Sequence, residues 1–215
     1  MFKNINILNN PYLLIKTIFD VIFALNFLIL GLPLFIFISI LIKFSSRGPI
    51  FFLQKRIGKD KKYFYCIKFR TMHPEAEFML DNLITSNKEL RKEFDENHKL
   101  KNDPRITNIG KFLRKTSLDE IPQFINILKL EMSLVGPRPI VKEEIKKYGD
   151  SLANVLSVKP GITGLWQISG RNNLSYKRRV FLDCLYVKDF NFFMDLRIII
   201  RTLGVVFFPN DRGAY

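Results

Sequence analysis

An apolar run near the N-terminus, Val21–Ile42, constrains this 215-residue chain more than any other feature. Within it only Asn26 and Ser39 are polar, and Gly31 and Pro33 stand near its middle. As one straight helix the run would span about 33 Å, which is enough for the hydrocarbon core of a bilayer. It is too long for a cleaved signal peptide, and no small-residue cleavage site follows it. The sequence therefore predicts a membrane element.

Two conformations of this element agree with the sequence: a straight transmembrane helix and a re-entrant helical hairpin. Pro33 removes one helical hydrogen bond, and Gly31 lowers the helix propensity beside it. The halves on either side of the proline, Val21–Leu32 and Leu34–Ile42, are each too short to cross a bilayer alone. These features favour a hairpin broken at Pro33, although prolines also occur in straight transmembrane helices.

Basic residues flank the apolar run at both ends. Lys16 precedes it, and Lys43 and Arg47 follow it. Because basic residues prefer the cytoplasmic side of a membrane, two basic flanks indicate that both ends lie there. We therefore expect two units. Residues 1–47 form an N-terminal segment with a re-entrant membrane helix, and residues 48–215 form a membrane-associated cytoplasmic domain.

The charge of the chain indicates an anionic partner. It has 34 Lys and Arg residues against 20 Asp and Glu, a net charge of +14. Nucleic acid, phosphorylated small molecules and acidic lipid headgroups would all suit it. Nucleic acid is not expected, because the aromatic residues do not interleave with a basic groove.

Cysteine and histidine are too few to build several kinds of site. Cys66 and Cys184 have no metal-binding spacing and form no disulfide framework. The two histidines, His73 and His98, have no convincing serine or cysteine partner, so a membrane acyltransferase or hydrolase with a histidine base is not favoured.

The rest of the chain predicts an α+β fold that is mostly helical. Two strands, Ile50–Gln54 and Tyr63–Arg70, form a β-hairpin around the turn Gly58-Lys59-Asp60. The expected helices are Pro74–Asn97 (as one or two helices), Ile109–Lys115, Ile121–Lys129, Glu143–Gly149 and Phe192–Phe208. The last of these is either a core helix or an amphipathic helix in the membrane interface, and its long apolar run favours the interface.

Two adjacent carboxylates, Asp119 and Glu120, stand out in this basic chain. Ser117 and Glu120 have the spacing of a capping box for the helix Ile121–Lys129. Because proline is tolerated only in the first helical turn, Pro122 makes Asp119 an alternative N-cap. In either register both carboxylates lie at a helix N-terminus, where the dipole keeps a carboxylate ionised. An isolated pattern of this kind is usually a cap and nothing more.

Three arginines lie in or beside rigid loops. Arg114 precedes the acidic pair, Arg138 stands between Pro137 and Pro139, and Arg171 follows a glycine. Arginine donates bidentate hydrogen bonds that match phosphate oxygens. Each alone would be an ordinary surface residue, but together with the acidic pair they predict a site for a diphosphate substrate.

The two carboxylates cannot do the same job, because adjacent helical residues point about 100° apart. One is suited to act as a nucleophile and the other to bind Mg²⁺, which usually takes one or two carboxylates together with substrate phosphates. From the residues alone, the assignment of Asp119 and Glu120 to these roles stays open.

A set of motifs running along nearly the whole chain resembles the small monotopic phosphoglycosyl transferases of bacteria. These enzymes move a sugar-1-phosphate from a UDP-sugar to polyprenyl phosphate. The matching motifs are Lys68-Phe69-Arg70-Thr71-Met72, Ser117-Leu118-Asp119-Glu120-Ile121-Pro122-Gln123, Asn126-Ile127-Leu128-Lys129, Met132-Ser133-Leu134-Val135-Gly136-Pro137-Arg138-Pro139, Lys159-Pro160-Gly161-Ile162-Thr163-Gly164 and Gly170-Arg171-Asn172. The chain resembles the catalytic core of the larger relatives, without their extra N-terminal membrane helices.

The resemblance implies roles for particular residues. Asp119 would be the nucleophile, and Glu120 would bind Mg²⁺ or act as a base. The family's re-entrant helix is broken at a proline, which corresponds to Pro33, although Leu32 stands where some relatives carry serine. The residues expected to contact substrate are Lys68, Arg70, Arg114, Pro137, Arg138, Pro139 and Arg171.

The resemblance also implies the partners: a UDP-sugar, polyprenyl phosphate and the bilayer, with a homodimer possible. The expected location is the bacterial inner membrane, with the catalytic domain on its cytoplasmic face, at the first membrane step of exopolysaccharide, capsule, O-antigen or glycoprotein glycan assembly. The C-terminal sequence Asp211-Arg212-Gly213-Ala214-Tyr215 favours galactose or glucose over an N-acetylated or diamino sugar. The alternative of a different class is a non-catalytic, membrane-tethered anion-binding protein.

Overall fold

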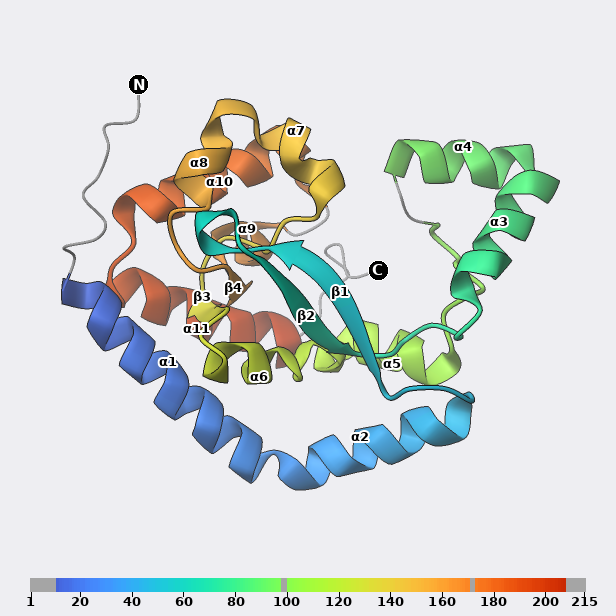
Figure 1. The fold of residues 1–215 in the computed structure, drawn as a ribbon, viewed down its shortest axis with the longest axis horizontal. Helices are drawn as coiled ribbons and strands as arrows, with labels where there is room; N and C mark the ends of the chain where they lie inside the picture. Colours follow the sequence, from blue (N-terminus) through green and yellow to red (C-terminus); the bar gives the residue numbers. More distant parts are fainter. Residues whose placement is uncertain (1–10, 98–99, 171–172, 208–215) are drawn as a thin grey trace.

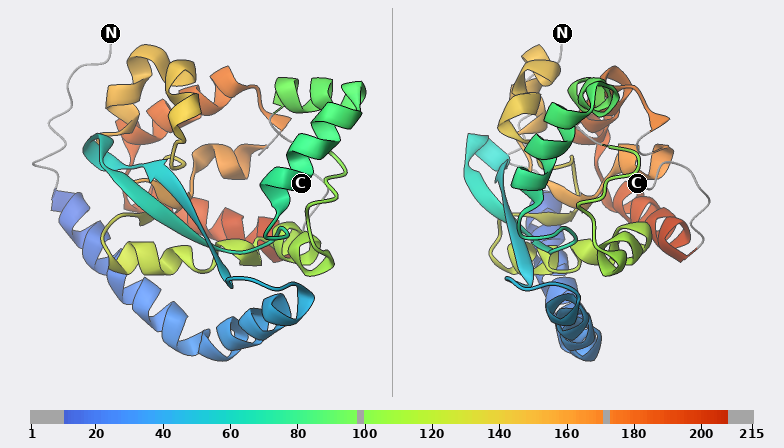
Figure 2. Two further views of the ribbon diagram at one scale, coloured as in Figure 1. Left: turned by 45° about the vertical axis from the view of Figure 1, so that its right-hand side comes forward. Right: turned by 90° about the vertical axis from the view of Figure 1, so that its right-hand side faces the viewer.

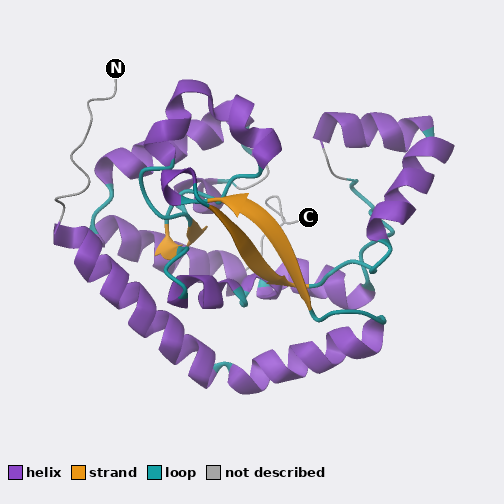
Figure 3. Ribbon diagram, in the orientation of Figure 1, coloured by secondary structure: helices purple, strands orange, loops and turns teal. Residues whose placement is uncertain are grey.

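The computed structural model describes residues 11–97, 100–170 and 173–207 (Figure 1). The predicted class is confirmed, because helices dominate and the strands form two small sheets (Figure 3). Two long N-terminal helices form an open V along one side of the molecule, and the remaining elements gather above it (Figure 2). The predicted division of the chain at residue 47 stays a prediction.

The two arms of the V are α1 (Pro11–Leu30) and α2 (Leu32–Ser45), and Gly31 lies between them. Pro33 sits in the first turn of α2, where a missing N–H removes no helical hydrogen bond. The helix break predicted from Pro33 is thus confirmed. The expectation that both halves are short is wrong, because α1 starts well before Val21 and by length and composition alone could cross a membrane.

Both arms pack against the rest of the molecule along one face. Phe27 of α1 stacks on Phe124 with ring centroids 4.1 Å apart. Ile38 and Ile42 of α2 are buried in a cluster with Phe69 and other apolar side chains. The opposite faces expose apolar side chains, which include Leu14, Ile15, Ile18, Phe19, Ile22, Ile29, Leu30, Ile36, Phe37, Ile40 and Phe44.

The predicted β-hairpin is confirmed. Strands β1 (Phe51–Ile57) and β2 (Tyr63–Phe69) are antiparallel, and the turn between them contains the short helix η2 (Lys59–Lys61). The outer edge of β2 is closed by Asn126, whose side chain accepts a hydrogen bond from the N–H of Ile67 and donates one to the carbonyl of Tyr65. This fully buried amide replaces a neighbouring strand and joins the hairpin to α6 (Gln123–Leu128).

A second sheet was not predicted. Strands β3 (Ser133–Val135) and β4 (Gly161–Thr163) are parallel and three residues long, which is too short to show an alternating pattern. Their backbones come so close that a Cβ on Gly161 would lie 2.1 Å from the amide nitrogen of Gly136. Gly136 and Gly161, which lie in the two predicted loops, therefore permit the pairing of β3 with β4. This pairing orients the loop after β3, which carries Arg138.

The capping box predicted at Ser117 is wrong. Ser117 has a left-handed backbone (φ 57°), ends helix α5 (Asn108–Thr116) and makes no side-chain cap. Leu118–Glu120 form a separate 3₁₀ turn, η3, and α6 begins only after Pro122. The two carboxylates thus lie in a short turn between two helices, held by β2, and not in the first turn of a long helix.

The other elements complete the upper part of the molecule. Helices α3 (Ala76–Ser86) and α4 (Lys88–Asn97) form a projecting arm, as predicted for this segment (Figure 1). The long helix α10 was not predicted, whereas α11 lies near its predicted range. The remaining bounds are η4 (Lys142–Glu144), α7 (Ile145–Tyr148), η5 (Gly149–Ser151), α8 (Leu152–Val155), α9 (Leu165–Ser169), α10 (Tyr176–Asp189) and α11 (Phe192–Phe207).

Helix α11 has two unlike faces. Asp195 and Ile198 are buried against the core. The other face exposes a stripe of apolar side chains: Phe192, Phe193, Leu196, Ile200 and Leu203. The helix therefore packs on the core and also exposes an apolar stripe, and its location in the membrane interface stays a prediction.

Candidate active site

The structure brings Asp119 and Glu120 against the inner face of the β-hairpin. Lys68 of β2 reaches across to η3, and its Nζ lies 2.6 Å from Oε1 of Glu120. The pair is partly shielded, with the Lys68 side chain 18% exposed and that of Glu120 32% exposed. Lys68 and Glu120 were both predicted site residues, and the fold places them together.

The two carboxyl groups have opposite pKa shifts. Burial and the negative charge of Glu120 raise the pKa of Asp119 to about 6, and Lys68 and Arg114 only partly oppose this. Burial alone would also raise the pKa of Glu120, but Lys68 and the guanidinium groups of Arg138 and Arg56 hold it below its usual value. At neutral pH Glu120 is therefore fixed as an anion. The helix dipole expected to favour the ionised form of Asp119 does not lower its pKa, because desolvation outweighs it.

Arg114 lies beside the acidic pair. It occupies the last turn of α5, and its Nε donates a hydrogen bond to Thr71 Oγ1 over 3.0 Å. The carboxyl of Asp119 raises the pKa of this guanidinium, against the larger lowering by burial. Thr71 thus holds Arg114 in place, and the positive charge of Arg114 acts on the carboxyl group of Asp119.

Arg138 stands in a loop fixed by backbone contacts on both sides. The N–H of Gly136 donates to the carbonyl of Thr163 (2.9 Å), and that of Gly161 donates to the carbonyl of Pro137 (2.8 Å). The guanidinium of Arg138 lies over the ring of Trp166, 5.7 Å from its centroid. Its positive charge lowers the pKa of Glu120, so this loop lies within electrostatic range of the acidic pair.

Two other arginines of this region were not predicted. Arg56 is buried in β1, and its Nη1 donates to the carbonyl of Pro139 over 2.8 Å, which ties the hairpin to the Arg138 loop. Arg179 of α10 lies over the Trp166 ring, 5.0 Å from its centroid. No local motif marks either residue. The one signal in the sequence that could have indicated Arg179 was Trp166, the only tryptophan of the chain, because arginine side chains often lie over aromatic rings.

One predicted substrate residue, Arg70, has another placement. Arg70 lies at the end of α2, where its Nη2 donates to the carbonyl and the hydroxyl of Ser46. Its position caps the C-terminal end of a membrane-facing helix, where a cation is favourable. Arg171 lies outside the described residues.

The donor set fits magnesium better than a transition metal. Among the described residues there is no group of three or more His, Cys, Asp and Glu side chains that would form a complete protein cage. Magnesium needs only one or two carboxylates when substrate phosphates supply the other ligands. Glu120, ionised and partly exposed, meets this requirement.

Comparison with known proteins places these residues in a family. The family model described as bacterial sugar transferase matches residues 11–209, which include the membrane-facing helices and the whole acidic site. The chain belongs to this family. Asp119, Glu120, Arg114 and Arg138 lie within the residues that match this family.

Several curated proteins are similar to this family member. It is 44% identical over 200 residues to the exopolysaccharide production protein ExoY of Rhizobium meliloti (strain 1021), which covers 93% of this chain and 88% of that protein. It is 43% identical to the undecaprenyl-phosphate galactose phosphotransferase of Salmonella typhimurium and 36% identical to the UDP-glucose:undecaprenyl-phosphate glucose-1-phosphate transferase of Klebsiella pneumoniae. These matches cover 94% and 97% of this chain but only 42% and 43% of those proteins.

A buried carboxyl group lies behind the Arg138 loop. Asp183 of α10 is fully buried and accepts a hydrogen bond from the hydroxyl of Tyr148 over 3.0 Å. Burial raises the pKa of Asp183 to about 7, although Tyr148 and Arg138 act in the opposite direction. Asp183 therefore carries a proton over much of the pH range in which an exposed aspartate is ionised.

This shift predicts a pH-dependent stability. Between the ordinary pKa of 3.8 and about pH 7, the folded chain keeps a proton on Asp183 that the unfolded chain has lost, so the free energy of unfolding falls as the pH rises. In Asp183→Asn this fall should be reduced. Thermal unfolding of the detergent-purified chain between pH 5 and pH 8 measures it. Asp189→Asn, an exposed site on the same helix, should keep the wild-type slope, and an equal slope in Asp183→Asn would refute the assignment.

Proposed function

We propose that this protein transfers a sugar-1-phosphate from a UDP-sugar to polyprenyl phosphate and releases UMP. The observation that carries the proposal is the convergence of Asp119, Glu120 and Lys68 with Arg114 and Arg138. An acidic pair among cations suits a substrate with two phosphates and a bound cation. The printed names of the Salmonella and Klebsiella relatives describe reactions of this kind for those proteins.

The reaction takes place in two steps on Asp119. A carboxylate oxygen of Asp119 attacks the phosphorus that carries the sugar, the bond from this phosphorus to the bridging oxygen breaks, and UMP leaves with that oxygen. A phosphate oxygen of the lipid then attacks the same phosphorus and displaces the carboxylate. Because UMP departs before the lipid phosphate enters, the site holds fewer negative charges at once.

The environment of the two carboxyl groups suits this division of work. With a pKa of about 6, Asp119 is largely ionised at neutral pH, and among the described residues no ion pair occupies its carboxylate oxygens. Glu120 is already bound to Lys68 and is held as an anion. We therefore assign the nucleophile to Asp119, and a magnesium site to Glu120. Mg²⁺ bound there would offset the charge of the substrate phosphates.

The arginines and the loop bind the nucleotide. Arg114 approaches from α5 and Arg138 from the loop between Pro137 and Pro139, so two guanidinium groups face the acidic pair from different elements. We propose that they bind the diphosphate, and that Arg171, which the sequence also predicts for this role, takes part in it. Lys68 keeps Glu120 in place. We assign Arg70 to the end of α2.

The packing of the V supports a re-entrant membrane element. The N-terminal part of α1 bonds to Asp195 of α11, and Ser46 after α2 bonds to Arg70 of the hairpin. Because both outer ends are attached to one domain, they lie on the same side of the bilayer. The exposed apolar faces of α1, α2 and α11 would then enter the cytoplasmic leaflet of the bacterial inner membrane, and the catalytic domain would lie in the cytoplasm.

The sugar is proposed as a hexose. The Salmonella and Klebsiella relatives carry galactose and glucose in their names, which supports galactose or glucose for this chain over an N-acetylated or diamino sugar. The name of the Rhizobium relative likewise supports the first membrane step of a surface polysaccharide.

A covalent intermediate gives the first functional prediction. Incubated with UDP-galactose or UDP-glucose and Mg²⁺ but no lipid, the wild type should release about one UMP per chain and gain the mass of one sugar phosphate. Asp119→Asn should form no adduct, because an amide is a poor nucleophile, and the exposed substitution Asp150→Asn should behave as wild type. Intact-protein mass spectrometry is the measurement. UMP release only in the presence of polyprenyl phosphate, without any adduct, would favour direct transfer.

The role of Arg138 gives the second. Arg138→Lys keeps the charge but loses the bidentate fork, so kcat/KM for the UDP-sugar should fall about 10- to 100-fold, which corresponds to one charge-assisted hydrogen bond. Arg178→Lys makes the same change at an exposed arginine and should have no effect. If both variants turned over substrate at the wild-type rate, Arg138 would be a surface charge.

Membrane topology gives the third. Single cysteines at Asn6 and at Arg47, in a background without native cysteines, should both be shielded from a membrane-impermeant maleimide in intact cells. Both should react after lysis, which controls for their accessibility. Labelling of one position but not the other in intact cells would establish a transmembrane span and eliminate the re-entrant arrangement.

A further inference from the structure

A second polar site lies away from the acidic pair, between α1 and the body of the protein. A cavity of about 80 Å³ opens there. Its lining includes Leu13, Lys16 and Asp20 of α1, Lys59 of the hairpin turn, Lys159 before β4, and Phe190 after α10. Asp119, Glu120, Lys68, Arg114 and Arg138 are absent from its lining. We call it the lysine pocket.

The carboxylates of this region are already satisfied. Asp195 accepts hydrogen bonds from Tyr12 (2.7 Å), Lys16 (2.5 Å) and Tyr186 (2.8 Å). Asp20 accepts one from Ser133 over 2.5 Å. Lys16 is thereby paired with Asp195. In the part of the chain that the structure describes, Asp20 is the one other carboxylate at this place, so three lysines stand against two carboxylates and one positive charge is in excess.

Among the described residues, neither Lys59 nor Lys159 makes a side-chain hydrogen bond or an ion pair. Burial lowers the pKa of Lys159, and the charges of Lys59 and Lys16 lower it further, against the opposing effect of Asp20. Three ammonium groups from distant parts of the sequence thus share one small cavity. An anion between them would relieve their repulsion.

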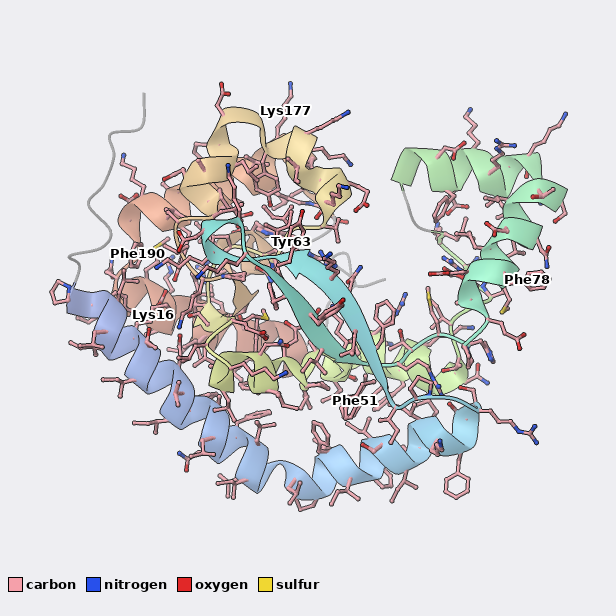
Figure 4. The ribbon with its side chains drawn as sticks, viewed as in Figure 1. Lys16, Phe51, Tyr63, Phe78, Lys177 and Phe190 are labelled. Atoms are coloured by element: carbon pink, nitrogen blue, oxygen red, sulfur yellow. The ribbon has the colours of Figure 1, made fainter. Side chains whose placement is uncertain are left out.

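The position of the pocket indicates where the anion comes from. The turns of α1 that supply Lys16 and Asp20 expose Leu14, Ile15, Ile18 and Phe19 on their outer face. Figure 4 shows Lys16 and Phe190 near one another, where α1 meets the C-terminal helices. With α1 in the membrane surface, which is part of the proposed function, the pocket lies at the level of the lipid headgroups.

We propose that the lysine pocket binds the phosphate group of a membrane lipid. Basic pockets beside membrane helices on the cytoplasmic side suit anionic headgroups. The cavity is several times the roughly 15 Å³ that one water requires, so it has room for a phosphate group but not for a nucleotide. Leu13 and Phe190 supply an apolar wall for the adjoining part of the lipid.

The experiment uses the delipidated full chain in detergent with four probes: phosphatidylglycerol, polyprenyl phosphate, diacylglycerol and inorganic phosphate. Native mass spectrometry measures the lipid retained, and thermal unfolding measures stabilisation. We expect at least one phosphate-bearing lipid to be retained and to raise Tm. The double variant Lys59→Gln/Lys159→Gln should weaken its binding at least about tenfold, because two charge-assisted contacts are lost. Lys177→Gln/Lys188→Gln removes two exposed charges from α10 and should bind as wild type.

Either phosphatidylglycerol or polyprenyl phosphate binds more tightly, and the tighter one is the lipid whose phosphate group occupies the pocket. Either result supports the proposal. Equal binding of diacylglycerol would show an apolar contact only, and equal stabilisation by inorganic phosphate would show a soluble-anion site. Either outcome, or unchanged binding by the Lys59/Lys159 variant, overturns the proposal. The adduct on Asp119 is measured in the same preparations. Loss of that adduct in the wild type would count against the proposed function and leave the lipid result standing.

Discussion

One buried carboxylate, Asp195 of α11, joins the N-terminal helix α1 to the C-terminal helices. Its oxygens accept hydrogen bonds from Tyr12 and Lys16 of α1 and from Tyr186 of α10. A buried carboxylate is tolerated only when its hydrogen-bonding capacity is met, and here three donors, one of them a cation, meet it. The pairing fixes α1 to the C-terminal helices. From the same helix, Asp20 bonds to Ser133 at the start of β3, and β3 leads directly into the loop that carries Arg138. The placement of α1 and that of Arg138 are therefore linked through a few polar contacts.

The β-hairpin is the second support of the site, and it acts through its inner face and one edge. Asn126 satisfies the free edge of β2 and so binds the hairpin to α6. On the inner face, Lys68 holds Glu120 and Arg56 holds the carbonyl of Pro139. A two-stranded hairpin has little stability alone, so these contacts both stabilise it and use it as a frame. The acidic turn and the arginine loop, which are close to one another in sequence but belong to different elements, share this frame.

How much of the fold could be predicted depended on the number of residues over which each element's sequence pattern extends. The apolar run, the break at Pro33 and the β-hairpin follow from periodicity and proline chemistry, and the structure confirms them. The capping box at Ser117 failed because Pro122 and a left-handed residue at position 117 ended one helix and delayed the next. Strands β3 and β4 were missed because three residues carry no period, and α10 because its buried and exposed residues are not cleanly separated.

The site itself was predictable where a motif was local. Asp119, Glu120, Arg114 and Arg138 were found from adjacent carboxylates and from arginines beside rigid loops. Arg56, Arg179 and Asp183 were not, because their roles arise only when distant elements pack, and a lone charged residue in a strand or helix predicts nothing. In the same way, the helix dipole was overestimated at Asp119, since desolvation depends on tertiary burial that no local pattern reports.

The open V of α1 and α2 has a consequence for the kind of membrane that this protein can occupy. A helix that crosses a bilayer must match its hydrocarbon thickness, and a mismatch costs free energy for every ångström. A bent pair with both outer ends on one domain has no second boundary to match. In the proposed arrangement it would be insensitive to acyl-chain length. It would also occupy area in one leaflet only, and so favour membranes in which the lipids of that leaflet can move apart.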